Sequence, residues 1–282
     1  MRADTARLHR AIDSIADAHR GVVGYVVRNL DTGEQLARRA DETFPTASLI
    51  KVPVLVTVFD LVGKGQLSLA DPLTLLKIDQ VDQGDGVLHL MHPGLVLTVG
   101  DAAWLMSTLS DNTATNLLLD RIIIRRVWEK MEALGLPHTK AHSKIGYRIS
   151  SVAIDSSVKY GIGVTTPAET ARLFELLARG RAVSPAADSA MLDILEHNKD
   201  EAMLARYRGP ARLAHKTGAV DRSRTDCGLF YLQSRVVACV LTKQNADTSY
   251  ALDAEPHLTI ARIGAAVVRA WPAAPPAAKA PP

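Results

Sequence analysis

The sequence predicts an α/β fold, an α+β sandwich into which an all-α lobe is inserted. Strand-like patterns lie near both ends of the 282-residue chain, and helical periodicity fills the middle. The terminal strands can form one antiparallel five-stranded sheet with the terminal helices on its face. We therefore assign residues 1–45 and 200–272 to a sheet subdomain and 46–199 to an all-helical subdomain. A cleft between two such layers is the expected place for an active site.

The N-terminal part predicts a helix followed by a hairpin. Apolar residues recur at helical spacing over the first turns, at Leu8, Ile12, Ile15 and Ala16. Residues 21–40 then indicate two strands joined by a turn at Asp31-Thr32-Gly33.

The middle of the chain predicts helices separated by loops rich in Gly, Pro and Asp. One helical face carries Val52, Leu55, Val56 and Phe59, and a second carries Ala102, Leu105, Met106 and Leu109. Thr166 before Pro167 is typical of a helix start.

The C-terminal part returns to strands, over residues 211–220, 227–232 and 236–243, with a hairpin tip at Gln233 and Ser234. Residues 257–270 predict a closing helix. We expect the Ala- and Pro-rich tail, 273–282, to be disordered because it has little to bury.

Composition excludes several function classes. The net charge of +3 is small, and Lys and Arg gather on no single stretch, so we expect no nucleic-acid partner. No segment reaches the roughly 18 apolar residues that span a membrane. We expect a monomer that acts on a small molecule or peptide. The charged N-terminus lacks the apolar stretch of a secretory signal. We therefore expect either a cytoplasmic protein or a periplasmic or secreted protein whose signal peptide was removed from this sequence.

Cys227 and Cys239 lie in apolar runs of neighbouring predicted strands. They can meet across a hairpin as a disulfide, but two buried free thiols are the favoured interpretation. No metal-ligand spacing accompanies them, and no metal or organic cofactor is expected.

A Ser-x-x-Lys pair, Ser48 and Lys51, predicts a serine nucleophile with its own base. Three residues apart on a helix, the two side chains share a face. A buried lysine near other cations has a lowered pKa and can take the serine proton. The helix N-terminus also favours negative charge beside Ser48.

Two further motifs supply the expected partners, Ser110-Asp111-Asn112 and Lys216-Thr217-Gly218. Ser110 can relay a proton to the leaving group, and Asn112 can bind a substrate carbonyl. Lys216 and Thr217, at a sheet edge, can bind a substrate carboxylate. The backbone N–H groups of Ser48 and Ala219 are candidates for an oxyanion hole.

These motifs, in this order, resemble the signature of class A β-lactamases and penicillin-binding proteins. The resemblance covers residues 22–270 and includes the stretches TASLIKVPVL, SDNTATNLLLD, TTPAETARL and HKTGAVDRSRTDCG. It implies a β-lactamase/transpeptidase-like fold and acylation of Ser48 by a β-lactam or a related amide or ester. It also implies that Arg222 or Arg224 helps to hold the substrate carboxylate, although either could be an exposed strand-end charge.

The chain departs from that family at the loop whose Glu-x-x-Leu-Asn motif holds the deacylating water. Residues 143–167 contain no Glu; Ser150 occupies about its position, and Asp155 is the only carboxylate nearby. Asp155 could be a substitute base, but a loop or N-cap role is favoured. Loss of one catalytic group typically costs about 10²- to 10⁴-fold. Glu169 is expected to suit the first turn of its helix rather than to act in catalysis.

Three functions remain open at this point. The leading one is a β-lactam-reactive serine hydrolase, of the class A β-lactamase type, with slow deacylation of penicillins. A carboxylesterase or peptidase on the same site is the alternative that the missing Glu favours. A penicillin-binding protein that stays acylated is the third.

Overall fold

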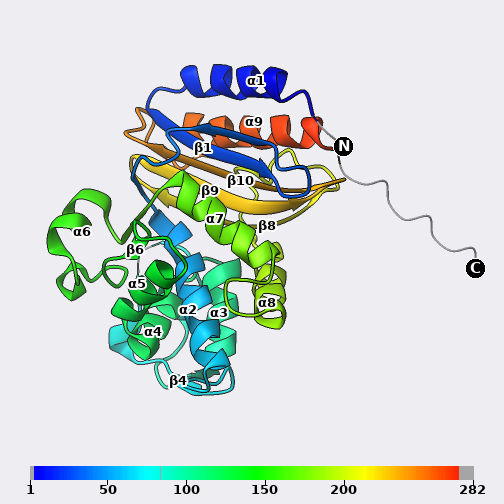
Figure 1. The fold of residues 1–282 in the computed structure, drawn as a ribbon. Helices are drawn as coiled ribbons and strands as arrows, with labels where there is room; N and C mark the ends of the chain where they lie inside the picture. The colour runs from blue at the N-terminus through cyan, green and yellow to red at the C-terminus, as the bar shows by residue number, and fades with distance from the viewer. Residues whose placement is uncertain (1–2, 83, 273–282) are drawn as a thin grey trace, which may run out of the picture.

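The computed structural model describes residues 3–82 and 84–272. Its centre is an antiparallel five-stranded sheet with strand order β2-β1-β10-β9-β8 (Figure 1). The predicted sheet is therefore confirmed, and β8 forms one of its edges. The strands are β1 (Val22–Asn29), β2 (Gln35–Arg38), β8 (Arg212–Val220), β9 (Ser223–Tyr231) and β10 (Arg235–Lys243).

The turn between β1 and β2 forms where the sequence predicts it. The buried Asn29 side chain accepts hydrogen bonds from the backbone N–H groups of Asp31 and Thr32, both at 3.0 Å. Gly33 has φ +80°, a left-handed conformation that costs glycine little.

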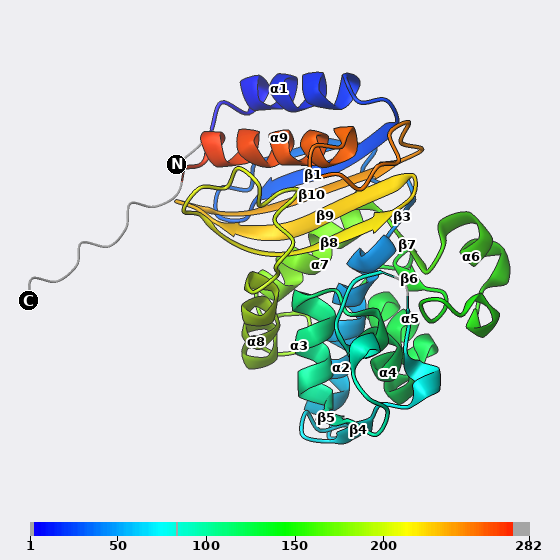
Figure 2. The same ribbon diagram turned by 180° about the vertical axis from the view of Figure 1, so that it is seen from behind.

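Two terminal helices, α1 (Thr5–Asp17) and α9 (Glu255–Ala270), cover one face of the sheet (Figure 2). Leu8, Ile12 and Ala16 of α1 are buried, while Ile15 is only partly buried. An apolar core between these helices and the sheet includes Tyr25, Val27, Phe230, Val240, Ile260 and Ile263. The predicted layer of terminal helices is confirmed.

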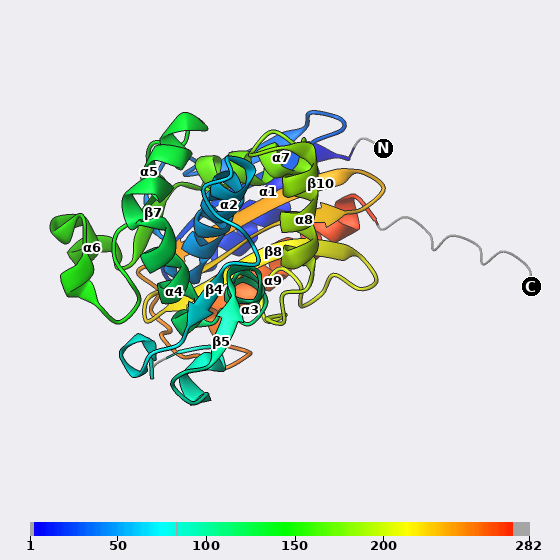
Figure 3. The same ribbon diagram turned by 90° about the horizontal axis from the view of Figure 1, so that it is seen from below.

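The opposite face of the sheet carries the helical part of the chain. Its helices are α2 (Lys51–Gly63), α3 (Val99–Thr108), α4 (Asn112–Ile122), α5 (Ile124–Ala133), α6 (Ile154–Tyr160), α7 (Pro167–Ala178) and α8 (Pro185–Glu196). In the view from below, α2 lies among the other helices (Figure 3). It is buried on all sides, because Val54 and Val58 are covered as well as the predicted face. Thr166 caps α7 as predicted.

The sheet and the helical part share one continuous apolar core. Helix α7 packs against β1, β9 and β10. Val26, Leu229 and Val237 of the sheet belong to the same cluster of buried residues as Leu55 of α2 and Phe174 of α7. The division into 1–45 plus 200–272 and 46–199 remains a proposal about two subdomains that are joined by this core.

Two small sheets within the helical part were not predicted. One consists of β3 (Phe44–Pro45), β7 (Gly163–Thr165) and β6 (Lys140–Ala141), and the other of β4 (Pro72–Thr74) and β5 (Val96–Thr98). Strands of two or three residues are too short for an alternating pattern to be recognised.

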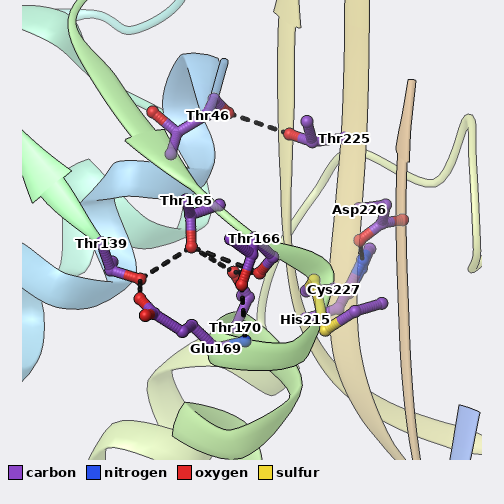
Figure 4. The surroundings of a disulfide bond; sticks show 11 residues. Thr46, Thr139, Thr165, Thr166, Glu169, Thr170, His215, Thr225, Asp226 and Cys227 are labelled. Atoms are coloured by element: carbon purple, nitrogen blue, oxygen red, sulfur yellow. Dashed lines mark hydrogen bonds and ion pairs between the residues drawn. A yellow bond between two sulfur atoms is a disulfide. The ribbon is translucent and has the colours of Figure 1, made fainter. Parts of the chain in front are cut away.

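Cys227 and Cys239 form a disulfide between β9 and β10 (Figure 4). The favoured prediction of two free thiols is therefore wrong. The two residues are register partners, with Cα atoms 4.1 Å apart, and both are buried. A register shift of one residue would have placed them on opposite faces of the sheet, so the strand patterns alone could not decide the pairing.

None of the helices among the described residues is long and apolar enough to cross a membrane. The predicted disorder of residues 273–282 concerns a segment outside the described residues.

Candidate active site

Ser48 lies in η1 (Ala47–Ile50), a short 3₁₀ turn that leads into α2. The α-helix itself therefore begins at Lys51. Ala47, immediately before the serine, has φ +45°, a conformation that residues other than glycine rarely adopt. Such strain costs roughly 1–3 kcal/mol and persists only where the surroundings hold the backbone.

The sheet edge supplies that restraint. β8 approaches η1 so closely that a Cβ on Gly218 would lie 2.6 Å from Thr46 O and 2.9 Å from Leu49 N. Thr225 of β9 donates its hydroxyl to Thr46 O at 2.9 Å, as Figure 4 shows. Gly218 thus permits, and Thr225 secures, the contact between the sheet edge and the turn that carries Ser48.

Lys51 is buried at the start of α2. Its Nζ donates to Ser110 O at 2.6 Å and to Asn112 Oδ1 at 2.8 Å, and it lies 3.0 Å from Ser110 Oγ. Burial, together with the nearby Lys216 cation, holds the pKa of the Lys51 ammonium well below its usual value. A neutral amine has two N–H donors for the two carbonyl oxygens and a lone pair left for a hydroxyl proton.

Ser110 lies between the two lysines. Its Oγ is 3.0 Å from Lys51 Nζ and accepts from Lys216 Nζ at 3.1 Å. Ser110 has φ +55°, a second left-handed backbone beside the nucleophile. Burial lowers the pKa of Lys216 to about 8, against the opposing effect of nearby carboxylates. Lys216 also donates to Thr217 O at 2.8 Å. The structure thus brings the three sequence motifs into one hydrogen-bonded group.

The Ser48 hydroxyl makes no hydrogen bond within the described part of the chain, so the predicted Ser48–Lys51 bond is not formed in this state. Active-site hydrogen bonds commonly tighten only when substrate binds.

Asp111 and Asn112 have separate roles. Asp111 is buried, caps α4 by accepting from Ala114 N at 2.8 Å, and holds the preceding loop through Val87 N and Leu88 N. Asn112 binds Lys51 and also lines the cavity beside Ser48.

A cavity of about 570 Å³ opens at Ser48. The sheet side contributes Ala219, Val220, Arg222 and Ser223, and the loop around α6 contributes the opposite wall. Ala219 thus lies at the cavity as the oxyanion-hole prediction requires. Ser110, Lys216 and Thr217 are buried and do not line the cavity, although Lys51 joins Ser110 to the lining residue Asn112. The remaining lining residues are Pro45, Ala47, Ile145, Arg148, Lys159, Tyr160, Gly161, Ile162, Lys243 and Gln244.

The two predicted arginines are separated. Arg222 is exposed in the turn between β8 and β9 and lines the cavity. Arg224 is completely buried on the α9 side of the sheet, where it donates to His257 Nε2 at 3.0 Å, Ser223 O at 3.0 Å and Ser249 O at 2.7 Å. It also stacks on the Tyr250 ring. Arg224 therefore braces the hairpin from behind and does not line the cavity.

Neither residue considered for deacylation lines the cavity. Asp155 is exposed in the first turn of α6. Ser150 is held in its own loop, where its Oγ donates to Tyr147 O at 2.6 Å and accepts from Lys144 N at 2.9 Å. No Asp or Glu is among the described residues that line the cavity.

Glu169 and His215 lie outside the cavity and hold secondary-structure elements together. Glu169 accepts from His138 N at 2.9 Å and from Thr139 Oγ1 at 2.6 Å, and so ties α7 to the small sheet (Figure 4). His215 pairs with Asp226 at 3.0 Å on the strand face opposite Lys216. His89 and His92, on the loop that Asp111 holds, do not line the cavity either.

Sequence reasoning missed the basic residues of the cavity wall, Arg148 and Lys159. Both lie in the segment 143–167 that contains no Glu, and the signal that could have found them was the surplus of cations over carboxylates in that segment. Among the described residues, no three His, Cys, Asp or Glu side chains are grouped so as to hold a metal ion.

Comparisons with known proteins show the family and the fold of this chain. The model of a family described as "Beta-lactamase enzyme family" matches residues 7–271. A solved β-lactamase from Sphaerobacter thermophilus DSM 20745 is 29% identical, with 95% of this chain and 97% of that chain covered and a TM-score of 0.83. PBP-A, solved as a mutant in an acyl-enzyme complex with penicillin G, is 27% identical over 94% of this chain and 96% of that one, with a TM-score of 0.82. An ancestral class A β-lactamase is 26% identical over 94% and 100%, with a TM-score of 0.82.

Proposed function

This chain belongs to the β-lactamase enzyme family and is a β-lactamase-like serine hydrolase, and from that premise we propose that β-lactams or related amides and esters acylate Ser48 and that penicilloyl groups leave it slowly. The observation that carries the proposal is the buried group formed by Lys51, Ser110 and Lys216 beside a half-buried serine.

Acylation follows from the contacts of Lys51. As a neutral amine it takes the Ser48 hydroxyl proton while Ser48 Oγ forms a bond to the substrate carbonyl carbon. The backbone N–H groups of Ser48 and Ala219 stabilise the oxyanion. As the carbonyl re-forms and the C–N or C–O bond breaks, the proton passes from Lys51 through the Ser110 hydroxyl to the leaving atom.

Lys216 and Thr217 bind the substrate carboxylate on the leaving-group side. The Lys216 cation also donates to Ser110 Oγ, which directs the Ser110 proton toward Lys51 or the leaving atom. Asn112 presents its amide to the acyl part of the substrate, since it lines the cavity.

Slow deacylation is proposed because the described residues of the cavity lining include no carboxylate that could activate water. Asp155 and Ser150 are both engaged or exposed elsewhere, so a water molecule near the acyl carbonyl has no base of the usual kind. Removal of a general base typically costs about 10²- to 10⁴-fold in rate.

Nitrocefin hydrolysis tests this function, with the wild type compared with Ser48→Ala. We expect a burst of about one equivalent followed by slow turnover, both abolished by the substitution. Fast steady turnover would show that another group activates water, and no reaction in either protein would contradict acylation by β-lactams.

A carboxylesterase or peptidase activity on the same site is the second candidate, favoured by the absent carboxylate. An ester substrate would leave a less hindered acyl group on Ser48 than a penicillin does. Water can hydrolyse such an acyl-enzyme without the carboxylate base that a penicilloyl-enzyme needs. Turnover of p-nitrophenyl esters that is lost in Ser48→Ala, in a protein that nitrocefin does not acylate, would favour this activity over the β-lactam one.

A further inference from the structure

Among the described residues that line the cavity at Ser48, every charged side chain is a cation. Arg148 and Lys159 extend from the segment around α6, which stands at the side of the molecule (Figure 1), and Arg222 and Lys243 from the sheet side. Asp155 and Asp221 belong to the same two segments, but neither of them lines the cavity.

Among the residues that the structure describes, one of these four cations has a carboxylate partner. Lys243 pairs with Glu42 at 2.7 Å, donates to Thr43 O at 2.8 Å and packs over the Phe44 ring. Arg148, Lys159 and Arg222 make no ion pair within the described part of the chain.

The Lys159 side chain nevertheless packs against an aromatic ring, that of Tyr160. Its Nζ lies 4.9 Å from the centre of the Tyr160 ring, an arrangement that favours a cation over an aromatic face. The Tyr160 hydroxyl is in turn 2.8 Å from Thr43 Oγ1, and this contact holds the ring beside the residue that precedes β3. Lys159 is thus connected through Tyr160 to the chain segment that leads into β3 and η1.

The cavity receives the acyl part of the substrate. The leaving group must be close to Ser110, which returns the proton, and neither Ser110 nor its partner Lys216 lines the cavity. Asp85, which acts electrostatically on Lys51 and Lys216, is exposed on the loop whose backbone accepts from Asn112 N, and it does not line the cavity. The acyl chain therefore extends from Ser48 along Ala219 toward Arg148, Lys159 and Arg222.

We infer that this site prefers acyl donors with an anionic group on the acyl side, in addition to the carboxylate that Lys216 and Thr217 bind. The inference rests on the proposed acylation of Ser48 and narrows its substrate class to dianionic amides, lactams or esters. Unpaired cations around a partly enclosed cavity attract such a substrate and hold its second anion.

Benzylpenicillin and carbenicillin provide a matched pair of probes, since carbenicillin has one extra carboxylate on its acyl side chain. Acylation rate constants for both are measured by time-resolved intact-protein mass spectrometry at low salt. We expect the carbenicillin-to-benzylpenicillin ratio to fall about 2- to 5-fold in Arg148→Gln and in Lys159→Gln, the size of one partly exposed ion pair. The ratio should fall further in the double variant.

Arg181→Gln is the control, because Arg181 is exposed between α7 and α8 and does not line the cavity. It should leave the ratio unchanged. Adducts from both compounds with one ratio in every variant would overturn this inference and leave Ser48 acylation standing. No adduct from either compound would overturn the proposed function, and this inference with it.

Discussion

At the residue scale, the two buried lysines have different tasks despite being joined through one hydroxyl. Lys51 must be neutral to take a proton, and burial beside a second cation favours that state. Lys216 must be charged to bind a carboxylate, and its pKa of about 8 leaves it mostly protonated near neutral pH. Acylation is therefore expected between two limits, one set by each lysine.

The pH dependence of acylation tests this difference. The rate should fall with decreasing pH as Lys51 becomes protonated. It should also fall as pH rises through about 8, because Lys216 loses its charge. Lys216→Arg keeps the cation at high pH, so the alkaline limit should move upward by at least one pH unit in kcat/KM profiles, even if the maximum rate is lower.

An alkaline limit that stays in place in Lys216→Arg would contradict the assignment of this limit to Lys216.

Most of the reacting residues at this scale could be predicted from the sequence. Ser48, Lys51, Ser110 and Lys216 were named from motif spacing, because the chemistry demands those residue types. The different surroundings of Arg222 and Arg224 could not be predicted, since two positions so close in sequence share a strand end, and only the packing of α9 shows that Arg224 is enclosed.

At the scale of elements, the edge strand β8 determines where η1 lies. Gly218 permits an approach that any side chain would prevent, because its Cβ would meet backbone atoms of Thr46 and Leu49. These atoms cannot move aside without moving Ser48.

Gly218→Ala should therefore slow acylation by about 100-fold, the effect that a displacement near 1 Å can have on a reacting group. The measurement is the rate of adduct formation with benzylpenicillin in a variant whose folding is checked by circular dichroism. Gly63→Ala is the matched control: its Cβ would meet only Val183 Cγ1 at 3.6 Å, an ordinary contact, and acylation should be unaffected. Equal rates in the two variants would show that the contact at Gly218 does not position Ser48.

The disulfide between β9 and β10 gives a second prediction at this scale. Protein purified without reductant and then denatured should contain no thiol that reacts with Ellman's reagent, and two after reduction. Two reactive thiols in the unreduced, denatured protein would restore the interpretation that the sequence favoured.

The long elements were predictable and the short ones were not. Helical periodicity in α1 and the apolar run of β1 are clear because these elements have eight or more residues, whereas β3, β6 and β7 have two or three residues each. These short strands matter, because β3 leads into η1 and β7 supports it. Their pairing depends on contacts between distant parts of the chain.

At the scale of the whole molecule, one apolar core joins the sheet to the helices and leaves the reacting group at their junction. The fold class was predictable from the order of strands and helices. The charge of the cavity was not, because Arg222, in the turn between β8 and β9, meets Arg148 and Lys159 of the α6 segment only in the folded chain. The missing carboxylate, in contrast, was visible in the sequence as the absence of Glu between residues 143 and 167.

Rapid acylation of Ser48 followed by slow release of the acyl group would appear as a change in the mass of the intact protein that persists over time. The most direct measurement is intact-protein mass spectrometry after a short exposure to benzylpenicillin and removal of the excess. We predict one covalent adduct that persists for minutes or longer and is absent in Ser48→Ala. An adduct that disappears within seconds, or an adduct that still forms in Ser48→Ala, would contradict the account.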